Sequence, residues 1–112
     1  LGDVYKRQVY NLVENAIKYN RPSGSVTVNI HSAESAVLEV TDTGIGISPE
    51  NQEKIFDPFY RVDKSRSRAM GGAGLGLALV SEIARQHNGQ VKVTQSSEKG
   101  STIALMLPVT LL

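Results

Sequence analysis

The chain has 112 residues, 40% of them hydrophobic, which suits a single globular domain with one core. Twelve basic and eleven acidic side chains leave a net charge of +1. The protein as a whole therefore has no electrostatic field that would attract it to nucleic acid or to an anionic membrane. Cysteine is absent, which excludes disulfides, and no apolar run approaches the roughly 20 residues of a membrane-spanning helix. We therefore expect one cytoplasmic domain over residues 1–112.

The first predicted element is an amphipathic helix that ends near Tyr19. Its apolar side chains recur at the i, i+3, i+4 spacing, which places them on one side facing a core. They are Val9, Leu12, Val13, Ala16 and Ile17. Residues 1–7 continue this pattern poorly. We expect a truncated N-terminus, although read-through or cloning sequence would explain the misfit equally.

Two hairpins and two more helices are predicted after this helix. Residues 25–31 and 36–41 alternate polar and apolar side chains, as strands do, and so do residues 90–95 and 101–107. Ser48 and Pro49 predict the start of a short helix to Phe56, with Ser48 as its cap. A longer helix is expected from Leu75 to near His87, where Asn88-Gly89 supplies a left-handed stop.

This order of elements predicts the class of fold. Helices and hairpins alternate along the chain, which favours helices packed on one face of a mostly antiparallel mixed sheet. The expected fold is therefore a two-layer α/β (α+β) sandwich. Between the short helix and the last helix, residues 61–74 lose apolar periodicity and gather basic side chains and glycines, so we expect a mobile loop there.

Three polar residues form a stripe on the first predicted helix. Asn11, Asn15 and Lys18 stand at i, i+4 and i+7, on the side away from the apolar face. Amide oxygens suit a hard cation such as magnesium, and an ammonium group suits phosphate. An ordinary solvent-facing stripe is the alternative, because amides are common on exposed helix surfaces.

A carboxylate followed by glycines marks the end of the second predicted strand. Asp42 can accept a hydrogen bond from the exocyclic amine of a base such as adenine. Gly44 and Gly46 would let the backbone approach a flat ring or bend sharply beside it. A simple glycine turn with an exposed aspartate would give the same pattern.

The glycine-rich segment before the last helix is a candidate phosphate site. Glycines at a helix start bring free amides and the positive end of the helix dipole against an anion. Residues 71–77 have this form, but they match neither the Walker pattern nor the dinucleotide fingerprint. A glycine hinge without a ligand is the alternative. Of the basic residues in the preceding loop, Arg61 is our candidate for contact with phosphate.

The two histidines, His31 and His87, end a predicted strand and a predicted helix. Neither has a partner at the spacing of a metal site or of a nucleophile arrangement. We expect both to be structural.

Four segments together resemble the ordered boxes of the histidine kinase ATP-binding domain. They are residues 11–20 (NLVENAIKYN), 42–47 (DTGIGI), 55–61 (IFDPFYR) and 72–77 (GAGLGL). The match covers nearly the whole chain, and each box alone is weak. This resemblance implies a Bergerat ATP-binding fold that holds ATP and Mg²⁺.

The resemblance also implies a role for individual residues. Asn15 would coordinate Mg²⁺ with Asn11 in support, and Lys18 and Arg61 would meet phosphate. Asp42 would read adenine. The remaining nucleotide contacts would come from Tyr19, Gly44, Gly46, Ile47, Gly72, Gly74, Leu75, Gly76, Leu77 and Thr102, the last through a water.

In this family the chain would position Mg-ATP for transfer of a phosphoryl group to a histidine on a separate dimerisation segment. Nothing in the sequence matches that segment, so we do not expect the chain to phosphorylate itself. The expected partners are that segment and, through the full-length kinase, a response regulator, with no nucleic acid and no direct membrane contact. The parent protein could still be a membrane-bound sensor.

Two alternatives remain. An ATP-hydrolysing relative of the same fold, such as gyrase or the heat-shock chaperone, uses a glutamate one turn before the magnesium asparagine, where this chain has the amide Asn11. A non-catalytic nucleotide-binding interaction module is the other alternative.

Overall fold

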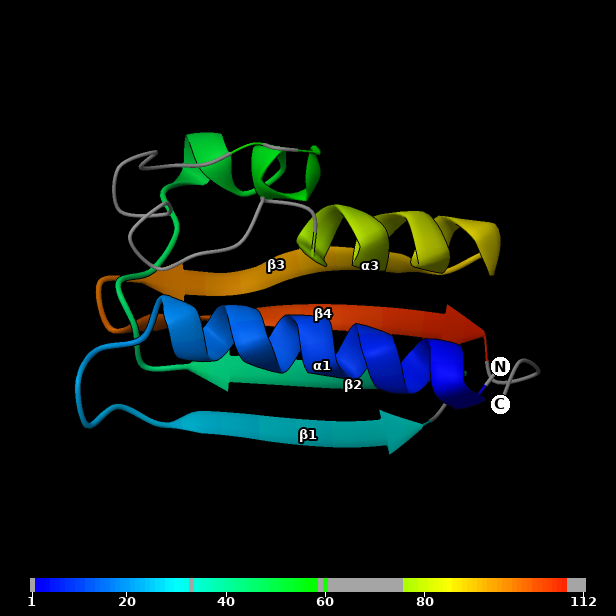
Figure 1. The fold of residues 1–112 in the computed structure, drawn as a ribbon, viewed down its shortest axis with the longest axis horizontal. Helices are drawn as coiled ribbons and strands as arrows, with labels where there is room; N and C mark the ends of the chain where they lie inside the picture. Colours follow the sequence, from blue (N-terminus) through cyan, green and yellow to red (C-terminus); the bar gives the residue numbers. More distant parts are fainter. Residues whose placement is uncertain (1, 33, 59, 61–75, 109–112) are drawn as a thin grey trace.

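The computed structural model describes residues 2–108 except 33, 59 and 61–75, and Figure 1 shows their arrangement. Within this part of the chain the elements are α1 (Gly2–Lys18), β1 (Val26–Ser32), β2 (Ser35–Asp42), η1 (Pro49–Asn51), η2 (Lys54–Phe56), α3 (Gly76–Gln86), β3 (Gln90–Ser97) and β4 (Gly100–Pro108). None of the helices described is long and apolar enough to cross a membrane.

The four strands form one sheet in the order β1-β2-β4-β3, and every neighbouring pair is antiparallel. The central strands β2 and β4 pair Asp42 with Ser101 and Val40 with Ile103. Both α1 and α3 lie on the same side of this sheet (Figure 1). The predicted two-layer sandwich is confirmed, and so are both predicted hairpins.

The core lies between the two helices and the central strands. Alternate residues of a strand face opposite sides, and in β2 the buried set is Ala36, Leu38, Val40 and Asp42. Each fully buried aliphatic side chain contributes roughly 1.5–3 kcal/mol relative to exposure. The cluster comprises Leu12 and Ala16 of α1, Val80 and Ala84 of α3, and Leu38, Val40, Ile103, Leu105 and Leu107 of the central strands.

Two apolar sets predicted to face the core are only partly buried. On α1, Leu12 is 1% exposed, but Ile17, in the last turn of the helix, is 62% exposed. On β1, Ile30 is 74% exposed and only Val26 packs against the core. β1 is an edge strand, and the packed helices cover the sheet mainly over its other strands.

The segment after β2 differs from its prediction. We expected one short helix from Pro49 to Phe56, but the structure has two separate 3₁₀ turns. Ser48 makes no side-chain cap, and its Oγ accepts a hydrogen bond from Asn51 Nδ2 at 2.7 Å. Proline is tolerated at the start of a 3₁₀ turn as it is at the start of an α-helix. The Ser48-Pro49 pair therefore predicted where the helical segment starts, but it did not predict the type of helix.

Residues 2–7, which fitted the helix pattern poorly, are part of α1. Tyr5 packs against the core, and its hydroxyl lies 3.0 Å from Nδ1 of His87, the residue that follows α3. As predicted, α3 ends at a left-handed residue: Asn88 has a φ of 61°, and the next amide, that of Gly89, donates to Ala84 O at 2.7 Å.

Candidate functional site

The candidate site lies at the end of the sheet where α1, β2 and β3 end and β4 begins, on the left in Figure 1. Three segments meet there: the end of α1, the loop after Asp42 and the turn between β3 and β4. They are distant in sequence, and the antiparallel pairing of β2 with β4 brings two of them together because Asp42 faces Ser101.

Asp42 is buried, with only 8% of its surface exposed. Its Oδ1 accepts a hydrogen bond from the amide of Gly44 at 2.9 Å, and its Oδ2 accepts one from the Ser101 hydroxyl at 3.2 Å. A buried carboxylate needs such partners because desolvation without them is costly. An ionised carboxylate has about four lone-pair positions, so this one retains capacity for a donor on a ligand.

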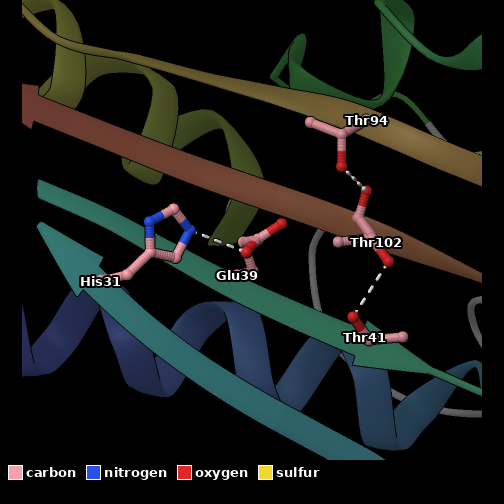
Figure 2. Close-up of polar contacts among 5 residues, drawn as sticks. All are labelled: His31, Glu39, Thr41, Thr94 and Thr102. Atoms are coloured by element: carbon pink, nitrogen blue, oxygen red, sulfur yellow. Dashed lines mark hydrogen bonds and ion pairs between the residues drawn. The ribbon is translucent and has the colours of Figure 1, made fainter. Parts of the chain in front are cut away.

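Thr102, which we expected beside a nucleotide base, lies on the other face of the sheet. Its hydroxyl is 2.9 Å from that of Thr41, and its carbonyl accepts a hydrogen bond from Thr94, as Figure 2 shows. Neighbouring residues of a strand point to opposite faces, so only one of Ser101 and Thr102 can reach Asp42. Ser101 was missed, although the alternation of Ser101, Ile103 and Leu105 on one face was readable in the sequence.

The loop after Asp42 is held closely on two sides. A side chain at Gly44 would place its Cβ 2.2 Å from the carbonyl oxygen of Tyr19, and one at Gly46 would come within 2.0 Å of that of Ser97. Gly46 also has a φ of 76°, which favours glycine. The loop therefore runs in close backbone contact with the end of α1 and with β3.

Ile47, the last residue of this loop, is hydrogen bonded through both its backbone groups. Its amide donates to Ser96 Oγ at 2.6 Å, and its carbonyl accepts from Gln52 Nε2 at 3.0 Å. These bonds fix the far end of the loop to β3 and to the segment between the two 3₁₀ turns.

Asn11, the first residue of the polar stripe on α1, lies beside the start of α3. A Cβ at Gly76, the first residue of α3, would make ordinary contacts of 3.9–4.0 Å with the Asn11 side chain. Asn11 Nδ2 donates to Oε1 of Gln8 at 3.3 Å, and Gln8 is itself only 4% exposed. The helix that carries Asn11 and Asn15 thus borders the end of the glycine-rich segment.

Lys18, at the end of the stripe, forms an ion pair with Glu14, with 3.0 Å between Nζ and Oε1. A hydrogen bond from the Tyr10 hydroxyl, and then the contact with Lys18, lower the pKa of Glu14 below its ordinary value. The same bond raises the pKa of Tyr10. Glu14 is therefore a stably ionised partner of two side chains of its own helix.

Residues 55, 56 and 60 of the third box are held against the body of the protein. Ile55 and Phe56 pack against the core, and the Tyr60 hydroxyl donates to Oδ1 of Asn51. Leu77 also packs against the core at the start of α3. Of the predicted site residues, Arg61, Gly72, Gly74 and Leu75 lie outside the described residues, as does the whole of the loop expected at 61–74.

Both histidines have partners within the fold. His31 Nε2 lies 3.0 Å from Oε1 of Glu39 on the face of the sheet away from the helices (Figure 2), and His87 contacts Tyr5. Among the residues that the structure describes, no three His, Cys, Asp or Glu side chains form a group that could hold a metal.

Comparison with known proteins gives a family match and close relatives. Residues 3–111 match the family model described as histidine kinase-, DNA gyrase B-, and HSP90-like ATPase. The chain is 46% identical to the sensor histidine kinase RppB of Synechocystis over 92% of the chain and 23% of RppB. It is 50% identical to the sensor-like histidine kinase SenX3 of Mycobacterium tuberculosis over 88% of the chain and 24% of SenX3. The chain spans about a quarter of the length of these relatives.

Solved structures show the same fold. The mycobacterial sensor histidine kinase MprB aligns with a TM-score of 0.81 at 32% identity, over 96% of this chain and 72% of that one. Full-length ShkA in complex with AMPPNP also has a TM-score of 0.81, at 28% identity, over 94% of this chain and 21% of that one.

Proposed function

Because the chain belongs to the family of histidine kinase-, DNA gyrase B- and HSP90-like ATPases, we propose that it binds Mg-ATP beside Asp42 and positions the terminal phosphate for transfer to a histidine on a separate segment. The work of such a module is to hold the nucleotide in place and neutralise charge. The observation that carries the proposal is the buried Asp42 carboxylate, held by Gly44 and Ser101 at the rim of the sheet.

Asp42 would read the base. Adenine presents an exocyclic amine, which donates a hydrogen bond to a carboxylate oxygen, whereas guanine presents an oxygen at the same position and would be repelled. Gly44, Gly46 and Ile47 would border the base, since their backbone is already held against the end of α1 and β3. In this proposal Ser101 takes the place beside the base that we had expected for Thr102.

The stripe on α1 would serve the phosphates. Asn15 would hold Mg²⁺ with Asn11 beside it, Lys18 would meet phosphate, and Gly76 and Leu77 at the start of α3 would line the triphosphate. The Asn15 side chain fits Mg²⁺, because this ion usually takes few protein atoms as ligands and keeps several waters. A single amide oxygen is therefore sufficient. When bound, Mg²⁺ neutralises charge on the triphosphate.

Transfer is favoured over hydrolysis by the residues of α1. The position one turn before Asn15 is Asn11, an amide that cannot take a proton from water at neutral pH. The carboxylate nearest to Asn15 in the sequence is that of Glu14. It is paired with Lys18 and has a lowered pKa, which makes it a poor base. The names of the relatives RppB and SenX3 support the same choice.

A phosphoryl acceptor on another segment and a response regulator would be the partners of the longer protein. The sensor kinase names of the relatives support both proposals. A cytoplasmic location would follow from these partners, whether or not the parent protein is a membrane sensor.

Calorimetric titration tests the nucleotide site. We expect the chain to bind ATP more tightly than GTP, and Asp42→Asn, which replaces one of the two acceptor oxygens with a donor NH₂ group, to reduce that preference. Asn15→Ala should remove the part of the affinity that depends on Mg²⁺. Glu39→Gln on the opposite face is the matched control. Equal affinity of the unaltered chain for ATP and GTP would refute the proposal.

A second experiment tests the reaction. With radiolabelled ATP the chain alone should acquire no stable label and hydrolyse ATP slowly. A purified helical segment from a sensor kinase should become labelled on its histidine when the chain is added, and the same segment without that histidine should not. Rapid turnover that disappears in Glu14→Gln would favour the hydrolase instead.

A further inference from the structure

Arg21 connects three segments at the rim of the candidate site. Its Nε donates to the carbonyl oxygen of Gly44 at 3.3 Å, and its Nη2 donates to the carbonyl oxygen of Glu98. Gly44 belongs to the loop after β2, and Glu98 belongs to the turn between β3 and β4. One guanidinium group therefore joins the end of α1 to both of the other segments.

The backbone of Arg21 is held in place by its neighbours. Its amide donates to Asn20 Oδ1 at 2.8 Å, and the same oxygen accepts from the Thr43 hydroxyl at 2.9 Å. Asn20 Nδ2 donates to Ser25 O at 2.8 Å, and the Ser25 amide donates to Thr43 Oγ1 at 2.8 Å. This network fixes where the arginine side chain starts, which lowers the entropy lost when the guanidinium group binds the two carbonyls.

Gly44 is consequently held from two sides. Its amide donates to Oδ1 of Asp42, and its carbonyl accepts from Arg21. A shift of the Gly44 backbone would remove the donor that orients the Asp42 carboxylate. A contact on the surface of the protein can thus determine the direction of a buried acceptor.

We propose that Arg21 is a positioning residue for Asp42, whose two-point contact with Gly44 and Glu98 holds the loop in the geometry that recognises an adenine amine. Arg21 itself touches no part of the nucleotide in this scheme. The ordinary alternative is an arginine that adds only general stability to the fold. The inference rests on the function proposed above.

The first test uses hydrogen exchange of the chain without nucleotide. Arg21→Ala should raise the exchange rates of the Gly44 and Ile45 amides by roughly tenfold. This is about the effect of losing one hydrogen bond to a charged group. Amides of the core strand residues Leu38 and Leu105 should not change. The matched control is Lys99→Ala, which removes a cation that lies in the β3–β4 turn itself. It should leave the exchange rates of all four amides unchanged.

The second test uses ATP and inosine triphosphate, which differ in having an amine or an oxygen at the position that Asp42 would read. Arg21→Ala should lower the affinity for ATP about tenfold and that for inosine triphosphate less than about twofold, so that the preference for ATP falls. A general loss of stability would lower the affinities for both nucleotides equally. Lys99→Ala should leave the preference unchanged.

Arg21→Lys separates charge from geometry, because one ammonium group cannot bond both carbonyls in the way that the arginine fork does. We expect it to restore less than half of the lost preference, and full restoration would overturn the proposal. A preference that is intact in Arg21→Ala would also overturn it and leave the proposed function standing. An unaltered chain without any preference for ATP over inosine triphosphate would instead refute the proposed function.

Discussion

The Ser101 hydroxyl donates a hydrogen bond to Oδ2 of Asp42 at 3.2 Å, across the register that pairs the last residue of β2 with the second residue of β4. The contact depends on the side of the sheet that each residue faces. Thr102, one residue further along β4, places its hydroxyl against Thr41 on the opposite face (Figure 2).

The first prediction compares these two hydroxyls. Ser101→Ala removes a donor from the buried carboxylate, so we expect the affinity for ATP to fall severalfold, corresponding to about 1 kcal/mol for one hydrogen bond. Thr102→Val keeps the shape of the side chain on the other face and should leave the affinity unchanged. Calorimetry with ATP measures both. A larger effect of Thr102→Val than of Ser101→Ala would contradict the assignment.

The second prediction concerns two glycines with different surroundings. Gly44→Ala would drive a Cβ to 2.2 Å from a backbone carbonyl, which cannot move aside as a flexible side chain can. We expect a loss of about 1–3 kcal/mol in the free energy of unfolding, measured by urea denaturation. Gly76→Ala meets only ordinary contacts at 3.9 Å at the start of a helix and should be neutral or stabilising by up to ~1 kcal/mol. The reverse order would show that the loop is not tightly enclosed.

The third prediction follows from the lowered pKa of Glu14. A carboxylate whose pKa is lower in the folded state stabilises the fold at pH values above its unfolded pKa, and this contribution disappears as the pH falls through the folded pKa. Glu14→Gln should therefore be less stable than the unaltered chain at neutral pH, and the difference should shrink at pH values below the ordinary value of 4.5. Urea denaturation at several pH values measures the difference.

An NMR titration of the Glu14 carboxyl group gives an independent check of its pKa. In Tyr10→Phe, which lacks the hydroxyl that is the largest cause of the shift, the pKa of Glu14 should rise toward its ordinary value. A pKa for Glu14 that is the same in both chains would rule out this cause.

The fourth prediction tests whether residues 2–7 belong to the fold. Tyr5→Phe removes the hydroxyl that lies 3.0 Å from His87 Nδ1, so we expect a loss of about 0.5–1.5 kcal/mol in the free energy of unfolding. This contact joins the start of α1 to the end of α3, whereas Asp42 is the last residue of β2, and these element ends lie at opposite ends of the sheet in Figure 1. The affinity for ATP should therefore not change. Lys6→Ala, on an exposed neighbouring residue, is the control. Equal stability of all three chains would indicate that the start of α1 is not part of the cooperative fold.

Much of the fold was predictable because its signals are local. The spacing of Leu12 and Ala16 predicts a helix with one buried side, and the alternation in residues 36–41 predicts a strand, without knowledge of any partner. Ile17 and Ile30 carry the same apolar signal, yet both are exposed. Whether an apolar residue is buried depends on which element covers it, and that is decided by the tertiary packing and not by the local pattern.

The sequence by itself determined the layers, the order of the elements and the family, because periodicity, capping residues and four ordered motifs are written along the chain. Only the tertiary structure decided which hydroxyl faces Asp42, and it brought Arg21 to Gly44 and Glu98. Those contacts join residues far apart in sequence, and they depend on strand register and on the face that each side chain takes. A change of one position in register would exchange Ser101 for Thr102, because successive residues of a strand point to opposite sides.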